Sequence, residues 1–62
     1  MPDFTFRTAI STDVARMVDI ECRAFGRDTP EARAHKRRDI ERELAWHVVM
    51  VHDSEPVACA RI

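Results

Sequence analysis

Two apolar runs near the carboxy-terminal end place the strongest constraint on the fold of this chain. Residues 47–52 read His-Val-Val-Met-Val-His, and residues 57–62 read Val-Ala-Cys-Ala-Arg-Ile. Successive side chains of a strand point to opposite faces, so apolar residues at both odd and even positions predict strands that are covered on two sides. The intervening polar turn, Asp53-Ser54-Glu55-Pro56, predicts that the two strands form a hairpin.

The amino-terminal part of the chain predicts a strand followed by an amphipathic helix. Residues 3–9 alternate between two sets of side chains, as in a half-buried strand. Ser11, Thr12 and Asp13 then offer side-chain oxygens to the free amides of a helix start, and apolar residues recur after them at three- and four-residue steps. The only glycine, Gly26, predicts the left-handed residue that ends this helix.

A second helix is predicted from Thr29, which precedes Pro30 as a helix cap, to about Ala45. Its apolar seam is narrow and comprises Ala32, Ile40 and Leu44, widened by the aliphatic stems of Arg33 and Lys36. We therefore expect this helix to lie on the surface. Trp46, where the helix meets the next strand, is interpreted as a core or boundary anchor.

The predicted order is strand, helix, helix, strand, strand, with no internal repeat or linker. The fold class is therefore α/β in the α+β sense, with a mainly antiparallel sheet and both helices on one face. Two helices on one face leave the second face open, although the last two strands are apolar on both sides. A missing carboxy-terminal half or a second copy of the chain is expected to cover that face.

Charge and hydropathy argue against nucleic acid and membrane partners. Ten basic and eleven acidic side chains give a formal net charge of −1. The basic run at residues 35–38 is followed by acidic residues at helical spacing, which favours a solvated helix face. No apolar run approaches the roughly 20 residues that span a bilayer, and no secretory signal opens the chain. We expect a cytoplasmic protein.

The cysteines and histidines do not form a recognisable motif. Cys22 and Cys59 lack metal-ligand spacing and sit among apolar residues, so both are interpreted as structural thiols. His47 and His52 are five residues apart in one predicted strand, so they point to opposite faces and cannot share an ion. We assign no metal ligand and no catalytic residue in this chain.

Three motifs, in order, resemble the GCN5-related N-acetyltransferase (GNAT) family. Residues 6–9 with Asp13-Val14 are similar to its opening pattern, apolar-Arg-x-Ala followed by Asp-apolar. Glu21-Cys22-Arg23-Ala24-Phe25-Gly26 resembles the end of its first helix. The apolar strand at residues 48–51 and the turn and strand at residues 53–58 resemble its second strand, hairpin and third strand. Ala58, Ser54 and Ile10 depart from the family pattern, each at a cap or turn position.

The resemblance implies that residues 1–62 are the amino-terminal part of a single acetyltransferase domain, which transfers acetyl from acetyl-coenzyme A to a small-molecule or peptide amine. In that family the pantetheine pairs with the fourth strand, and the pyrophosphate sits on a (Gln/Arg)-x-x-Gly-x-(Gly/Ala) loop. This chain has one glycine and no tyrosine, the residue that protonates the departing thiolate in the family. The coenzyme A-binding half is thus absent, and we expect the isolated chain to be inactive and not to bind acetyl-coenzyme A.

The resemblance further implies that the end of the first helix and the following loop contact the acceptor. The expected substrate-binding residues are Glu21, Phe25, Arg27 and Asp28. For Glu21 an alternative stays open, because a carboxylate on an apolar stripe is commonly bonded to backbone amides or to a nearby arginine. A rival function also stays open, in which the chain is a small binding or regulatory module that dimerises or docks a partner through its uncovered sheet face.

Overall fold

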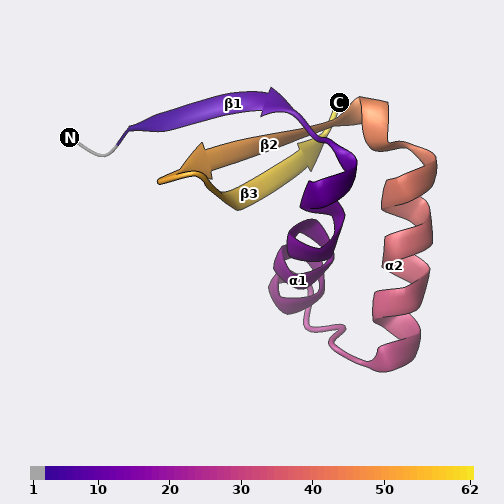
Figure 1. Cartoon of the computed structure of the whole chain (residues 1–62). Helices are drawn as coiled ribbons and strands as arrows, with labels where there is room; N and C mark the ends of the chain where they lie inside the picture. The colour runs from indigo at the N-terminus through magenta and orange to yellow at the C-terminus, as the bar shows by residue number, and fades with distance from the viewer. Residues whose placement is uncertain (1–2) are drawn as a thin grey trace.

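The computed structural model describes residues 3–62, which form an antiparallel sheet with two α-helices. Figure 1 shows the strands stacked on one side of the molecule and both helices on the other. The elements in chain order are β1 (Phe4–Thr8), the short 3-10 helix η1 (Ser11–Asp13), α1 (Val14–Ala24), α2 (Pro30–Arg42), η2 (Leu44–Trp46), β2 (His47–His52) and β3 (Glu55–Arg61). The α+β class and the order of the elements agree with the prediction.

The sheet has the order β1-β2-β3, and both pairings are antiparallel. The hairpin turn is tighter than predicted, because β3 begins at Glu55 and only Asp53 and Ser54 lie outside the strands. Both turn residues have positive φ, 52° and 67°. Such a turn matches the right-handed twist of the two strands. Pro56 follows within β3, where a register irregularity beside Met50 and Val51 accommodates it.

The core lies between α1 and the sheet. Met17, Ile40 and Val49 are its largest fully buried side chains, and they come from α1, α2 and β2. Because α2 contributes only Ile40 to the buried set, it packs mainly against α1 and lies on the surface, as its narrow apolar seam predicted. None of the helices within residues 3–62 is both long enough and apolar enough to cross a membrane.

The start of α1 is held by Asp13, whereas neither Ser11 nor Thr12 makes the predicted side-chain cap. The Asp13 carboxylate accepts the backbone N–H of Ile10 at 2.8 Å and both guanidinium nitrogens of Arg7, at 2.6 and 3.0 Å. Asp13 therefore ties the end of β1 to the beginning of the helix. The cap of α2 is the predicted one, since the Thr29 hydroxyl accepts the N–H of Ala32 at 3.1 Å.

The second face of the sheet is not covered within residues 3–62. Alternate residues of the three strands form it, namely Phe4, Phe6, Val48, Met50, Ala58 and Ala60. The register aligns Phe6 with Met50 and Met50 with Ala58, so these apolar side chains lie in a continuous row across the three strands. Phe6 remains 72% exposed. The apolar second face that the sequence predicted is therefore present and open to solvent; we call it the open sheet face.

Trp46 departs from the prediction, because 61% of it is exposed. It closes η2, and its backbone carbonyl accepts the N–H of Ile62 at 2.8 Å. Of the two positions predicted for Trp46, core or boundary, the core one is excluded, and the neighbouring His47 is buried instead. The indole therefore projects outward from the junction of helix and strand.

Candidate functional site

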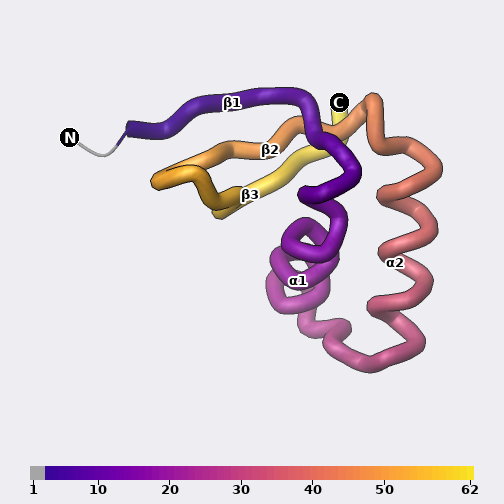
Figure 2. The backbone as a smooth tube through the Cα atoms, viewed as in Figure 1, coloured from indigo at the N-terminus to yellow at the C-terminus, as the bar shows by residue number. Residues whose placement is uncertain are grey.

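The candidate site is a cleft of about 720 Å³ between the end of α1 and residues 31–39 of α2. Figure 2 shows these segments joined by the short connection at the end of the molecule remote from the sheet. The cleft is lined by Glu21, Cys22, Phe25, Arg27, Glu31, Ala32, His35, Lys36 and Asp39. Charged groups of both signs thus surround a partly apolar hollow.

The break at Gly26 places Arg27 beside the cleft. Gly26 adopts φ 67°, as predicted, and the N–H of Gly26 donates to the carbonyl of Arg23 at 3.3 Å. The N–H of Arg27 donates to the carbonyl of Cys22 at 2.9 Å. These two bonds form a Schellman motif, which turns the chain back over the last turn of the helix. Arg27 is therefore held beside the last turn of α1, which carries Glu21, and beside Phe25, which follows that turn.

Glu21 is half-buried, and its partner is a thiol rather than the arginine or backbone amide considered from the sequence. The Sγ of Cys59 in β3 donates to Oε1 of Glu21 at 3.6 Å. Burial raises the pKa of the Cys59 thiol to about 11, and the negative charge of Glu21 adds to the shift. The thiol therefore stays protonated near neutral pH and acts as a donor to the carboxylate, not as a nucleophile.

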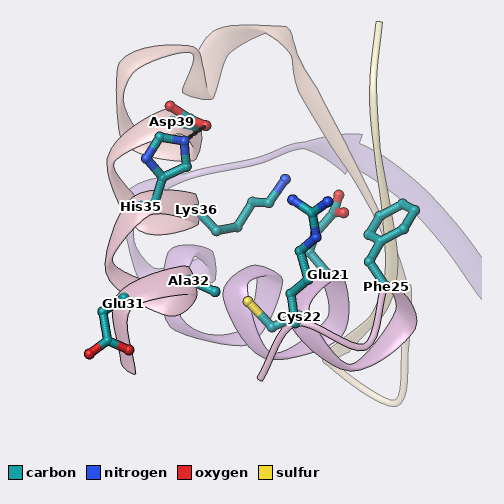
Figure 3. A pocket seen from close by; sticks show the side chains of 9 residues that line it. Glu21, Cys22, Phe25, Glu31, Ala32, His35, Lys36 and Asp39 are labelled. Atoms are coloured by element: carbon teal, nitrogen blue, oxygen red, sulfur yellow. Dashed lines mark ion pairs between the residues drawn. The ribbon is translucent and has the colours of Figure 1, made fainter. Parts of the chain in front are cut away.

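Lys36 brings a positive charge to the same part of the cleft. Figure 3 shows the Lys36 side chain reaching from α2 toward Glu21, with Phe25 beyond it. The Lys36 charge also acts on the Cys59 thiol, where it lowers the pKa against the larger effects of burial and Glu21. Within residues 3–62 no ion pair joins Lys36, Arg27 or Glu21 to another side chain.

Asp28, the fourth residue expected to contact the acceptor, does not line the cleft. Its Oδ1 accepts a hydrogen bond from Nε of Arg33, and Arg33 also donates to Asp19 of α1 at 2.9 Å. The bond to Arg33 holds the pKa of Asp28 below its ordinary value. Asp28 thus belongs to an ion-paired network that fixes α2 against α1. Glu21, Phe25 and Arg27, by contrast, are brought together as expected.

The contribution of α2 to the cleft was not anticipated from the sequence. Glu31, His35, Lys36 and Asp39 follow one another at helical spacing, and His35 pairs with Asp39 at 3.4 Å. The basic run at residues 35–38 is predicted to be a solvated face, and Arg37 and Arg38 are indeed exposed. The half-buried seam of α2, to which the stem of Lys36 was assigned, was the signal that could have identified Lys36.

The remaining histidines occupy separate environments. His47 is buried with Nδ1 2.9 Å from the carbonyl oxygen of Glu43. His52 stacks on Phe4 with ring centroids 4.8 Å apart. Among the described residues, no group of three or more His, Cys, Asp or Glu side chains is placed to hold a metal ion. Cys22 is buried, Cys59 is half-buried, and both are free thiols.

Comparisons with family models, curated proteins and solved structures found no match for this chain.

Proposed function

We propose that this chain is the acceptor-binding, amino-terminal part of an N-acetyltransferase domain. The observation that carries the proposal is the cleft at the end of α1, which gathers Glu21, Phe25 and Arg27. These are three of the residues to which the family resemblance assigns contact with the amine. A half-buried carboxylate beside an exposed aromatic ring suits an ammonium group, because the ion pair strengthens where water is partly excluded.

The fold is compatible with this role. The resemblance implies a strand, two helices and a hairpin at the amino-terminal end of the domain, and the chain has that order with the strands arranged β1-β2-β3. The outer edge of β3 would then be the place for the next strand of the sheet. The open sheet face would be covered by the rest of the domain.

The described residues do not fit acetyl-coenzyme A. The only glycine, Gly26, lies at the carboxy-terminal end of α1, where the helix dipole disfavours a pyrophosphate. At the amino-terminal end of α2, Pro30 has no N–H to donate, and the N–H groups of Ala32 and Arg33 already donate to the hydroxyl and the carbonyl of Thr29. The proposal therefore gives this chain the amine-binding role alone, and the coenzyme belongs to the other half of the domain.

The reading frame around this sequence provides the first test. We expect it, or its genomic neighbour, to continue into a strand and a (Gln/Arg)-x-x-Gly-x-(Gly/Ala) turn. The chain joined to that continuation should release coenzyme A thiol from acetyl-coenzyme A when an amine acceptor is added. A continuation with the turn but without acetylation of any primary amine would refute the proposal.

A second candidate function rests on the open sheet face. Its row of apolar side chains, with Phe6 largely exposed, would suit a binding or regulatory module that dimerises or docks a partner. A natural stop codon after Ile62, combined with a stable dimer in solution, would favour this module over the enzyme.

A further inference from the structure

The charges of the cleft divide into paired and unpaired groups. The paired groups of the lining are His35 and Asp39, 3.4 Å apart on α2. Outside the lining, Arg33 binds both Asp19 and Asp28 and so ties α2 to α1. In contrast, Glu21, Arg27, Glu31 and Lys36 line the cleft without an ion pair in the described part of the chain. Figure 3 shows Glu31 pointing away from Glu21 and Lys36, at the far end of the lining. Charges that face a partly enclosed hollow without a protein partner are available to a ligand.

The unpaired charges are opposite in sign and lie close to one another. Glu21 bonds to Cys59, and Figure 3 shows the Lys36 side chain reaching from α2 toward Glu21. The Schellman motif holds Arg27 beside Cys22, one residue along α1 from Glu21. A ligand that pairs with Glu21, Lys36 and Arg27 together would carry an ammonium and an anionic group within the span of this one cleft.

The rest of the lining is apolar enough to receive a hydrocarbon group. Phe25 lines the cleft and is 68% exposed, and Ala32 adds apolar surface from α2. Covering the Phe25 ring with a ligand side chain would remove apolar surface from water, and aromatic pairs add to that gain.

We infer that the cleft binds a small zwitterion, an α-amino acid with an apolar or aromatic side chain. Its ammonium pairs with Glu21, its carboxylate pairs with Lys36 and Arg27, and its side chain lies against Phe25. This inference rests on the proposed function in one respect, because the bound amine would be the group that receives the acetyl. The proposed function requires only the amine; the binding of the ligand's carboxylate by Lys36 and Arg27 is the new part of the inference.

Ligand-observed NMR with the 62-residue chain tests the inference, since saturation transfer to a small probe is measurable even if the chain self-associates. The probes are L-phenylalanine, phenethylamine, which lacks the carboxylate, and 3-phenylpropionate, which lacks the amine. We expect phenylalanine to bind roughly tenfold more tightly than either single-charge probe, the effect of one charged hydrogen bond. Equal affinities for the three probes, or no binding of phenylalanine, would overturn the inference.

Two variants test which residue binds which charge of the ligand. Glu21→Gln keeps an oxygen to accept the Cys59 hydrogen bond and should abolish the preference for phenylalanine over 3-phenylpropionate. Lys36→Met should reduce the preference over phenethylamine. Glu41→Gln and Arg38→Met are the matched controls, because both residues are exposed on α2 outside the cleft, and neither should change any affinity. Circular dichroism checks that each variant folds; unchanged preferences in folded Glu21→Gln and Lys36→Met would place the binding elsewhere and refute the site.

The same probes separate this inference from the proposed function. A completed domain that acetylates phenethylamine as well as phenylalanine would leave the enzyme proposal intact and remove the zwitterion preference. If the chain instead binds phenylalanine with the expected dependence on Glu21 and Lys36, but the completed domain acetylates no amine, the binding inference stands and the enzyme proposal fails.

Discussion

Asp13 is the polar residue on which the amino-terminal architecture depends most directly. Its side chain is 5% exposed, yet it is charged, because two nitrogens of Arg7 and one backbone N–H surround the carboxylate. A buried carboxylate that loses such partners destabilises the fold, because no hydrogen bond offsets the removal of its charge from water. The bond from Arg7 accordingly holds the pKa of Asp13 below its ordinary value.

We expect Asp13→Asn to lower the free energy of unfolding at pH 7 by about 1–3 kcal/mol, since an amide cannot accept both guanidinium nitrogens and the Ile10 N–H as the carboxylate does. A carboxyl whose native pKa is lowered stabilises the fold above its unfolded pKa, near 4, and loses that contribution as the pH falls through the native value. Urea titrations at a series of pH values should therefore show the gap between wild type and variant shrinking below about pH 4. Asp3→Asn, at an exposed position, is the control and should leave stability unchanged.

Arg27 and Asp28 are neighbours in sequence, but the structure separates their roles. Arg27 lines the cleft, whereas Asp28 is bound to Arg33 outside it. In a completed domain we expect Arg27→Ala to raise the acceptor KM with little change in kcat, because a binding contact is lost from ground and transition states alike. Asp28→Ala should leave the acceptor KM nearly unchanged. Steady-state kinetics with the amine varied would contradict this assignment if Asp28→Ala had the larger effect.

The β2–β3 hairpin is the element whose backbone conformation is least suited to its sequence. Asp53 and Ser54 both have positive φ, a region that costs a non-glycine residue roughly 1–2 kcal/mol. The resemblance places a glycine where Ser54 stands, so the sequence departs from the favoured residue at the position that needs it.

Ser54→Gly should therefore stabilise the chain. Glycine relieves the left-handed strain but gains freedom in the unfolded state, so we expect a net increase of about 0.5–1 kcal/mol in the free energy of unfolding. Thermal and urea denaturation measure the change. Ser11→Gly is the matched control, because Ser11 does not have positive φ and its replacement should bring no gain. Equal effects of the two substitutions would mean that the turn conformation is not the cause.

At the scale of the whole molecule, the main feature is the open sheet face, an apolar surface with no packing partner within residues 3–62. Phe6 is 72% exposed, and it belongs to a row of apolar side chains that crosses all three strands. Within residues 3–62 the helices cover only the opposite face, so the sheet has one layer of packing where its strands predict two. In water such a surface favours association with another apolar surface.

We expect the isolated chain to self-associate or to bind a hydrophobic dye strongly, and Phe6→Ser to weaken both effects, because it removes the most exposed ring of that face. Phe25→Ser is the matched control, since Phe25 is 68% exposed but lies in the cleft. Sedimentation velocity at several concentrations measures the association. A clean monomer with sharp cooperative unfolding, or an equal effect of Phe25→Ser, would contradict the assignment of association to the sheet.

The isolated chain should not bind acetyl-coenzyme A measurably. Its single glycine lies at a helix carboxy-terminal end. At the start of α2, Pro30 has no N–H, and the N–H groups of Ala32 and Arg33 are already bonded to Thr29. Isothermal titration calorimetry with acetyl-coenzyme A checks this expectation. Tight binding would place the coenzyme site within these residues and would require a different division of the domain.

The sequence by itself determined the element order, because the periods of its apolar residues and the signals at Gly26 and Thr29-Pro30 act over a few residues of chain. It also identified the two-sided apolar character of β2 and β3, which depends only on alternation. The tertiary structure decided which partners the polar groups found: Cys59 for Glu21, Arg33 for Asp28, and both Arg7 and the Ile10 backbone for Asp13. It also turned Trp46 outward and placed Lys36 in the cleft with Glu21. Those outcomes depend on contacts between segments far apart in the chain or on the geometry of a bend, and local periodicity carries no information about either.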